Sequence, residues 1–310
     1  MEKQTIKVFT TSSFESVTSI AILEELFDDT IDVEVEYTNN LDFRDVKRFK
    51  DYKTVIVLGV GYNGYNLPES FYTEVDNPFT DFIHVASWGE QIKGEHVISM
   101  VNESFDPIVL LYNILIDHPQ LSMINQHTKA TDKAKHMIKA VNDYRTWEWY
   151  DNKVTSYLLA LYHGTGKYMP SLLKGRTLND VVKENQYIIS GQMTEMNDYI
   201  QTKVEQARVA TIEVEGVQCK LKVIFAERYI NELANRLLEV GYNEVPTIVC
   251  VGRPTKGSDL FSVRTKGVDA RDFVEMIDGQ RKGKENVGSF FSGVNYSELM
   301  LNSTVTQINS

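Results

Sequence analysis

Residues 5–27 read TIKVFTTSSFESVTSIAILEELF, a β-branched apolar run that continues through a hydroxyl-rich stretch into apolar residues at helical spacing. The first six residues predict a strand over Thr5–Thr10, and the recurrence of apolar side chains from Val17 to Phe27 predicts a helix. We therefore expect a strand, a polar loop over Thr11–Ser16 and a helix, which is the opening of an α/β domain.

Strands and helices continue to alternate through the first part of the chain. Strands are predicted at Asp32–Tyr37, Thr54–Leu58, Phe82–Ala86 and His96–Met100, and helices at Asp42–Phe49, Phe105–Ile116, Ala130–Tyr144 and Lys153–Leu161. Such alternation predicts a parallel sheet with right-handed crossovers. Parallel sheets bind ligands at the carboxyl ends of their strands, which places the candidate site in the loops at 11–16, 59–66 and 86–91.

The pattern changes after a polar helix predicted over Gln192–Arg208. Strands follow at Thr211–Glu215, Cys219–Phe225, Thr247–Gly252 and Leu260–Arg264, with helices at Ile230–Val240 and Arg271–Ile277. We expect an α/β fold with a parallel-sheet, Rossmann-like N-terminal domain over 1–190 and a connecting helix over 191–207. A smaller α/β domain over 208–310 completes the chain, in keeping with the size of ordinary domains.

The chain of 310 residues carries a net charge of −11, and this charge is unevenly distributed. Residues 1–204 hold 19 basic and 29 acidic side chains, whereas residues 205–310 hold 13 and 14. A net-negative surface repels phosphate backbones, which argues against general binding to duplex DNA. A small, local basic site remains compatible with this composition.

Two cysteines, Cys219 and Cys250, lie within predicted strands, and we expect both to be buried, reduced thiols. The opening residues MEKQTIKVFT lack the apolar core of a signal peptide, and no run of 18 apolar residues occurs. These features predict a soluble, cytoplasmic protein that does not bind membranes.

Two loops are candidates for anion binding. The first contains Ser12 and Ser13 before a predicted helix, where hydroxyls and exposed amides suit an anion, although the same residues also serve as helix caps. The second is the basic turn Gly279–Gly288, which contains Arg281, Lys282, Gly283 and Lys284. With Arg264 it can hold a phosphate, or it can be an ordinary solvated loop.

Other motifs point less clearly to a function. Residues 59–64 match the dinucleotide pattern GxGxxG, but Pro68 stands where its helix should continue, and the preceding strand is not the first of the sheet. The pair Asp117 and His118 ends a helix, which favours a structural role. The segment Asn142–Trp149 is an aromatic cluster that fits either the core or the wall of a nucleobase pocket.

Several segments, in the same order, resemble the DHH phosphoesterase family with its associated C-terminal domain. That family opens with a strand, the motif (T)HxDxDG and a helix, and residues 9–20 share this frame. Thr11 then stands at the histidine, Ser13 at the first aspartate and Glu15 at the second. The family comprises two-domain, metal-dependent enzymes that act on short oligonucleotides, cyclic dinucleotides, nucleoside bisphosphates or polyphosphate.

The resemblance continues at the later strand ends. The next ligand aspartate of the family falls on Gly59, and the Asp-His-His after a further strand falls on Ala86, Ser87 and Trp88. In the second domain, Arg264 stands on the strand that carries a substrate-binding arginine in the family. The glycine-rich loop of the family falls on residues 282–285, where only Gly283 is retained.

These replacements leave Glu15 as the only strong metal ligand at the matched positions, and a pair of divalent ions needs several such ligands. The resemblance therefore implies a non-hydrolysing protein without a metal cofactor that binds a nucleotide or short oligonucleotide between its domains, in a sequestering or regulatory role. One alternative is an active phosphodiesterase with an Mn²⁺ or Mg²⁺ site formed by Glu15, Asp143 and His84. Another is a structural subunit that binds a protein partner. A homodimer is compatible with each.

Overall fold

The computed structural model describes residues 3–41, 46–61, 69–149, 152–240, 245–255, 257–281 and 283–292. The chain divides into two compact units, Met1–Met193 (unit 1) and Thr194–Ser310 (unit 2). The division falls within the long helix α10 (Gln186–Gln206), which begins in unit 1 and ends in unit 2. This helix starts before the predicted connecting segment because the apolar residue Ile189 is buried against unit 1.

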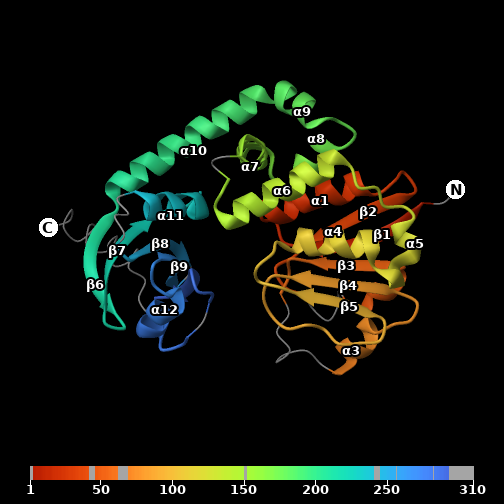
Figure 1. Ribbon diagram of the computed structural model, residues 1–310, viewed down its shortest axis with the longest axis horizontal. Coiled ribbons are helices and arrows are strands. Elements are labelled where there is room, and N and C mark those ends of the chain that lie inside the picture. The colour runs from red at the N-terminus through yellow and green to blue at the C-terminus, as the bar shows by residue number, and fades with distance from the viewer. Residues whose placement is uncertain are drawn as a thin grey trace. The chain divides into compact units, whose positions relative to one another are not determined.

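Among the described residues, unit 1 contains a parallel sheet of five strands in the order β2-β1-β3-β4-β5 (Figure 1). The strands are β1 (Gln4–Thr10), β2 (Ile31–Tyr37), β3 (Thr54–Leu58), β4 (Asp81–Ala86) and β5 (Val97–Val101). All five lie within a residue of the predicted ranges, and the parallel-sheet α/β architecture is confirmed. Strands β1, β3 and β4 are parallel neighbours, so the loops that follow them lie together at one edge of the sheet.

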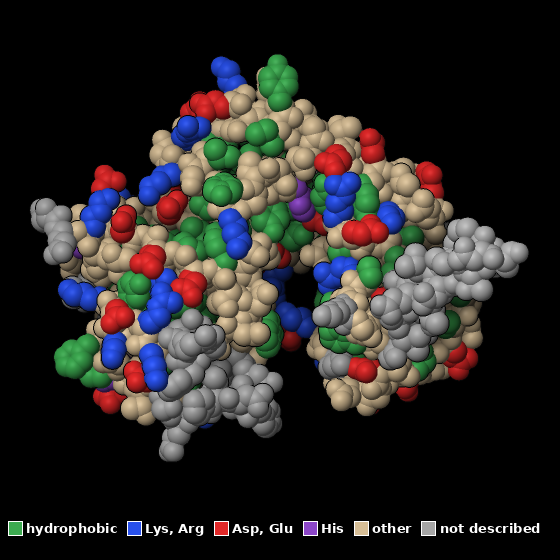
Figure 2. Space-filling view, turned by 180° about the vertical axis from the view of Figure 1, so that it is seen from behind, with side chains coloured by type: hydrophobic (Ala, Val, Ile, Leu, Met, Phe, Trp, Pro, Cys, Tyr) green, Lys and Arg blue, Asp and Glu red, His purple; other side chains and the backbone are tan. Residues whose placement is uncertain are grey.

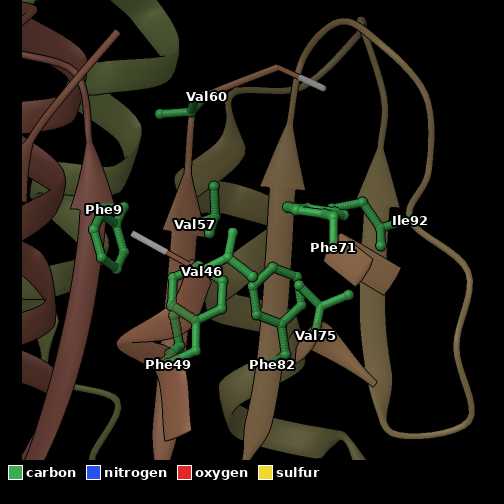
Figure 3. Packing of buried hydrophobic residues seen from close by; sticks show 10 residues of the cluster. Phe9, Val46, Phe49, Val57, Val60, Phe71, Val75, Phe82 and Ile92 are labelled. Atoms are coloured by element: carbon green, nitrogen blue, oxygen red, sulfur yellow. The ribbon is translucent and has the colours of Figure 1, made fainter. Parts of the chain in front are cut away.

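Apolar side chains cover both faces of this sheet. Figure 3 shows one face, where Phe9, Phe49 and Phe82 lie side by side, with the ring centroids of Phe49 and Phe82 5.3 Å apart. Helix α3 (Glu69–Val75) and the short 3-10 helix η1 (Phe49–Asp51) pack on this face. Burial of such aromatic side chains fixes the sheet that presents the strand-end loops.

The opposite face of the sheet is covered by helices α1 (Phe14–Leu26) and α4 (Pro107–Asp117), and α6 (Asp132–Thr146) packs onto α1. The remaining helices of unit 1 are α5 (Ser122–Asn125), α7 (Lys153–Thr165), α8 (Met169–Leu173) and α9 (Leu178–Glu184), with 3-10 turns at Pro119–Leu121 (η3) and Gly166–Tyr168 (η4). The helices predicted at 105–116, 130–144 and 153–161 are therefore confirmed, whereas α8 and α9 were not predicted. The helix predicted at 42–49 lies partly outside the described residues.

Helix α1 begins three residues earlier than the sequence pattern suggests. The side chain of Ser13 accepts a hydrogen bond from the backbone N–H of Ser16 and caps the helix. Phe14 is buried and packs edge-on against Tyr144. The expectation of a loop as far as Ser16 was wrong because a capped, buried first turn carries little of the apolar periodicity on which that expectation relied.

Unit 2 has a mixed sheet, for which the described residues supply five strands in the order β10-β9-β8-β7-β6. They are β6 (Arg208–Val214), β7 (Val217–Phe225), β8 (Thr247–Thr255), β9 (Ser258–Lys266) and β10 (Val287–Phe291); only the β7–β8 pair is parallel. Helices α11 (Ile230–Glu239) and α12 (Ala270–Asp278) pack on the sheet. All of these elements except β10 were predicted from the sequence.

Both cysteines are buried and reduced, as expected, with Cys219 on β7 and Cys250 on β8. Within the part of the chain that the structure describes, no helix combines the length and apolar character needed to cross a bilayer.

Candidate functional site

A small polar pocket of about 100 Å³ lies at the carboxyl edge of the parallel sheet of unit 1. Its walls come from the loops after β1, β3 and β4, the end of β3, the first two turns of α1, the start of α4 and one residue of α6. The lining residues are Thr11, Ser13, Glu15, Ser16, Ser19, Leu58, Gly59, Ser87, Asp106, Pro107 and Arg145. The pocket therefore includes Thr11, Ser13, Glu15, Gly59 and Ser87, five of the positions matched to ligands of the DHH family.

Three hydroxyls at the start of α1 form a compact hydrogen-bonded cluster in this pocket. The hydroxyl oxygens of Thr11 and Ser16 are 2.6 Å apart, and Ser13 lies 3.3 Å from each of them. The loop is held from outside by Tyr162, whose phenol donates to the backbone carbonyl of Ser12 at 2.7 Å. Hydroxyls both donate and accept, so the cluster can rearrange around either an anion or a sugar hydroxyl.

The pocket also contains two carboxyl groups and one guanidinium, of which only that of Glu15 was predicted from the sequence. Asp106 caps α4 by accepting from the N–H of Ile108 at 3.0 Å, and its side chain is almost fully buried. Burial, reinforced by the negative charge of Glu15, raises the pKa of Asp106 to about 7. Arg145 of α6 donates to the backbone carbonyl of Glu103 and opposes this shift.

Asp106 had a recognisable local signal, because it precedes Pro107 at the start of an apolar helical run. Asp at the cap and Pro at the first helical position are the usual arrangement at a helix N-terminus. This signal predicts that Asp106 caps a helix. It does not predict that Asp106 lines the pocket, because that depends on how α4 packs on the sheet. Arg145, in the last turn of α6, offers no comparable signal.

The other strand-end positions matched to family ligands are apolar or small. Gly59 has a φ of +73°, which favours glycine, and its N–H donates to Val85 at 2.8 Å. Ala86 is buried, and its carbonyl accepts from Asn102. Trp88 is half exposed and lies against Gly61.

His84 and Asp143 form their hydrogen bonds outside the strand-end pocket. His84 is buried within β4, where Nδ1 lies 2.9 Å from the Ser99 hydroxyl and Nε2 lies 3.1 Å from the Val60 carbonyl; burial lowers its pKa. Asp143 accepts hydrogen bonds from Lys139 and Asn152. Neither residue lines the pocket with Glu15.

The aromatic cluster near Asp143 belongs mainly to the core. Trp149 is 2% exposed, with its ring centroid 6.4 Å from that of Tyr144. Trp147 ends α6 with a left-handed φ of +67°. A buried ring cannot receive a base from solvent, so the structure favours the core interpretation for Trp149.

The donor set of the pocket does not fit a pair of divalent ions. Over the described residues, no group of three or more His, Cys, Asp or Glu side chains is arranged to hold a metal ion. The pocket supplies only Glu15 and Asp106, and the second is largely protonated below neutral pH. Two adjacent cations need several anionic or imidazole ligands to offset their repulsion and to activate water.

In unit 2, the side chain of Arg264 on β9 is fixed by two neighbours. One Nη donates to the Val263 carbonyl at 2.8 Å, and the other donates to Oδ1 of Asn231, at the start of α11, at 2.9 Å. This places the arginine beside the N-terminus of a helix, whose amides favour anions. Its predicted role as a ligand-binding residue stays a prediction.

The basic turn beyond α12 is less cationic than its composition suggests. Arg281 forms ion pairs with Asp269, Asp272 and Glu275, all at or within α12. Gly283 has a φ of +108°, and an added Cβ would lie 2.6 Å from the carbonyl oxygen of Val287, which explains a glycine here. Lys284 donates its backbone N–H to that same carbonyl, and Lys282 lies outside the described residues.

Two further surface features bear on ligand binding. A larger pocket of about 310 Å³ in unit 1 is lined mainly by Leu, Val and Ile side chains of α7, α8, α9 and α10, and it contains no acidic group. On the face that Figure 2 shows, basic side chains stand among acidic ones without forming a continuous basic patch. Neither feature offers a concentration of charged groups comparable to the strand-end pocket.

Comparisons with known proteins agree with the fold. The chain matches no protein-family model and no curated protein. Among solved structures, it is similar to RecJ in complex with Mn²⁺ from Thermus thermophilus, with a TM-score of 0.53 and 12% identity over 93% of this chain and 49% of that one. The chain thus spans about half the length of this RecJ. This likeness shows the fold alone, and the expected DHH-like two-domain fold is confirmed.

Two other solved structures match over most of both chains. One is an exopolyphosphatase-related protein from Bacteroides fragilis, with a TM-score of 0.49 and 12% identity over 98% of this chain and 92% of that one. The other is the pGpG-specific phosphodiesterase PggH from Vibrio cholerae, with a TM-score of 0.47 and 11% identity over 100% of this chain and 99% of that one.

Proposed function

We propose that this protein binds a nucleotide or short oligonucleotide at the strand-end pocket of unit 1 and releases it without hydrolysis, as a sequestering or regulatory protein. The observation that supports this proposal is the composition of the pocket. Hydroxyls of Thr11, Ser13 and Ser16 cluster where the DHH resemblance expects metal ligands, and they line a polar pocket.

The groups in the pocket suit the polar parts of a nucleotide. The hydroxyl cluster and Arg145 donate hydrogen bonds to phosphate oxygens, and Glu15 accepts from ribose hydroxyls. Because its pKa is about 7, Asp106 is partly protonated at neutral pH and repels a phosphate less than an ionised carboxylate would. These interactions bind a ligand but provide no activated water.

The test combines a binding assay with a turnover assay on the full chain. Linear dinucleotides, nucleoside bisphosphates and polyphosphate are incubated with the protein, once with Mn²⁺ and once with EDTA. We expect at least one nucleotide to raise the melting temperature in both conditions, because a ligand bound only to the native state stabilises it. We expect no product in either condition.

A matched pair of cap variants separates pocket chemistry from general stability. Ser13→Ala removes a pocket hydroxyl together with the cap of α1, whereas Thr131→Ala removes the cap of α6 and a hydrogen bond to Glu25, neither of which belongs to the pocket. Both variants lose about 1 kcal/mol of stability, but only Ser13→Ala should weaken nucleotide binding. Turnover abolished by Glu15→Gln would instead support an active hydrolase, and absence of any nucleotide-induced stabilisation would rule out the binding role.

A further inference from the structure

Two residues with exposed aromatic side chains are neighbours in sequence of residues that line the strand-end pocket. Trp88 is 50% exposed and follows Ser87, which lines the pocket; Phe105 is 46% exposed and precedes Asp106, which also lines it. The loops that carry them begin side by side, because Ala86 pairs with Val101 and accepts a hydrogen bond from Asn102 at 3.1 Å. Two residues with exposed aromatic rings therefore directly adjoin, along the chain, residues that line the polar pocket.

The indole of Trp88 is held in place by the backbone of Gly61. A Cβ built on Gly61 would lie 2.2, 2.3 and 2.5 Å from Cε2, Cδ2 and Cζ2, three adjacent ring atoms. Near-equal distances to three ring atoms mean that Gly61 lies against the face of the ring and not beyond its edge. Any larger residue at position 61 would displace the indole, so this glycine allows one ring face to be supported while much of the ring stays exposed.

We infer that Trp88 is a stacking platform for the nucleobase of the ligand whose sugar or phosphate enters the strand-end pocket. This inference rests on the proposed function and adds the orientation of the ligand. Gly59 and Ser87 line the pocket, and Gly61 and Trp88 lie one or two residues further along the same loops. A ligand with a polar group in the pocket thus has its base within reach of the indole.

The chemistry of this platform determines which ligands it accepts. Every base presents a π-face, so stacking on one ring contributes to affinity with little sequence preference. A supported ring also loses less conformational entropy on binding than a freely rotating side chain. We therefore expect binding that depends on the presence of a base more than on its identity.

The test compares a ligand with and without its base. Adenosine monophosphate and ribose 5-phosphate are titrated into the full chain by calorimetry. We expect wild-type protein to bind adenosine monophosphate about fivefold to 150-fold more tightly, the range that one stacked base contributes. Trp88→Ala should bring adenosine monophosphate down to the affinity of ribose 5-phosphate, with ribose 5-phosphate itself unchanged.

Three further variants control for packing. Trp88→Phe keeps an aromatic face and should retain most of the difference in affinity between adenosine monophosphate and ribose 5-phosphate. Trp88→Leu keeps an apolar side chain against Gly61 but has no ring, and it should lose that difference. Phe79→Ala removes a ring that is 86% exposed and precedes β4, at the opposite end of that strand from Trp88, and it should change nothing. Trp88→Leu also serves if Trp88→Ala does not fold.

The outcomes distinguish this inference from the function on which it rests. Equal binding of the two ligands by wild-type protein, or an unchanged difference in Trp88→Leu, would refute the platform but leave pocket binding intact. If wild-type protein binds neither ligand, the platform and the binding of mononucleotides at this pocket both fail.

Discussion

Two aspartates cap helices at the two regions that the sequence marked for ligand binding, and their environments are opposite. Asp106 caps α4 in the strand-end pocket of unit 1, and burial raises its pKa to about 7. Asp269 caps α12 in unit 2 and pairs with Arg271 at 2.5 Å and Arg281 at 3.3 Å. The hydrogen bonds from Arg271 hold the pKa of Asp269 below its usual range.

The comparison shows why charge counts along the sequence misidentify binding sites. The basic turn of unit 2 looks cationic in sequence, yet Arg281 is committed to the carboxylates at and within α12. The hydroxyl loop of unit 1 carries little charge in sequence, yet it borders a pocket that contains a carboxyl group titrating near neutral pH. Which charges remain available depends on tertiary neighbours.

The largest expected effect concerns the titration of Asp106. Its folded-state pKa of about 7 lies above the unfolded value, so this group binds more protons when folded, and its contribution to stability decreases as pH rises. Asp106→Asn keeps an N-cap acceptor and cannot ionise. Between pH 5 and pH 8, the free energy of unfolding of Asp106→Asn should rise by about 3 kcal/mol relative to that of wild type, as measured by urea denaturation. If the stability difference between wild type and Asp106→Asn stayed constant across that pH range, the raised pKa of Asp106 would be refuted.

The second prediction tests the opposite environment of Asp269. Its lowered pKa means that its contribution to stability is present above the unfolded pKa and is lost as pH falls through the folded one. At pH 7, Asp269→Ala should lose about 1 kcal/mol through the missing cap. Asp269→Asn should lose less, because it retains the cap and gives up only partly exposed ion pairs, and its deficit should shrink in high salt.

Thermal or urea unfolding at pH 7 in low and high salt distinguishes these contributions. The two asparagine variants should change stability in opposite directions at pH 8, with Asp106→Asn stabilising and Asp269→Asn destabilising. If both variants changed stability in the same direction, the electrostatic environments of the two aspartates would not be opposite.

Much of the fold was predictable because it depends on local patterns. The strands of unit 1 show in the sequence as short β-branched runs, and their spacing predicts a parallel sheet. Strand β10 (Val287–Phe291) was missed because the run Val-Gly-Ser-Phe-Phe is short and contains a glycine. It becomes a strand only through its antiparallel pairing with β9.

The candidate site was only partly predictable. Parallel-strand topology correctly placed Thr11, Ser13 and Ser87 at one edge, because the position of a loop follows from the strand before it. Asp106 and Arg145 were missed because their place depends on how α4 packs on the sheet and how α6 packs onto α1. The support of Trp88 by Gly61 also joins two loops that are distant in sequence, which no local pattern reveals.

The smallest expected effect isolates one cause of the Asp106 shift. Burial is the larger cause, and the negative charge of Glu15 adds to it. Glu15→Gln removes that charge while keeping a similar shape, so the pKa of Asp106 should fall but remain above its usual value, since burial is unchanged. Carboxyl carbon shifts followed by NMR across a pH titration measure this directly. An unchanged midpoint would mean that the charge of Glu15 makes no measurable contribution to the raised pKa of Asp106.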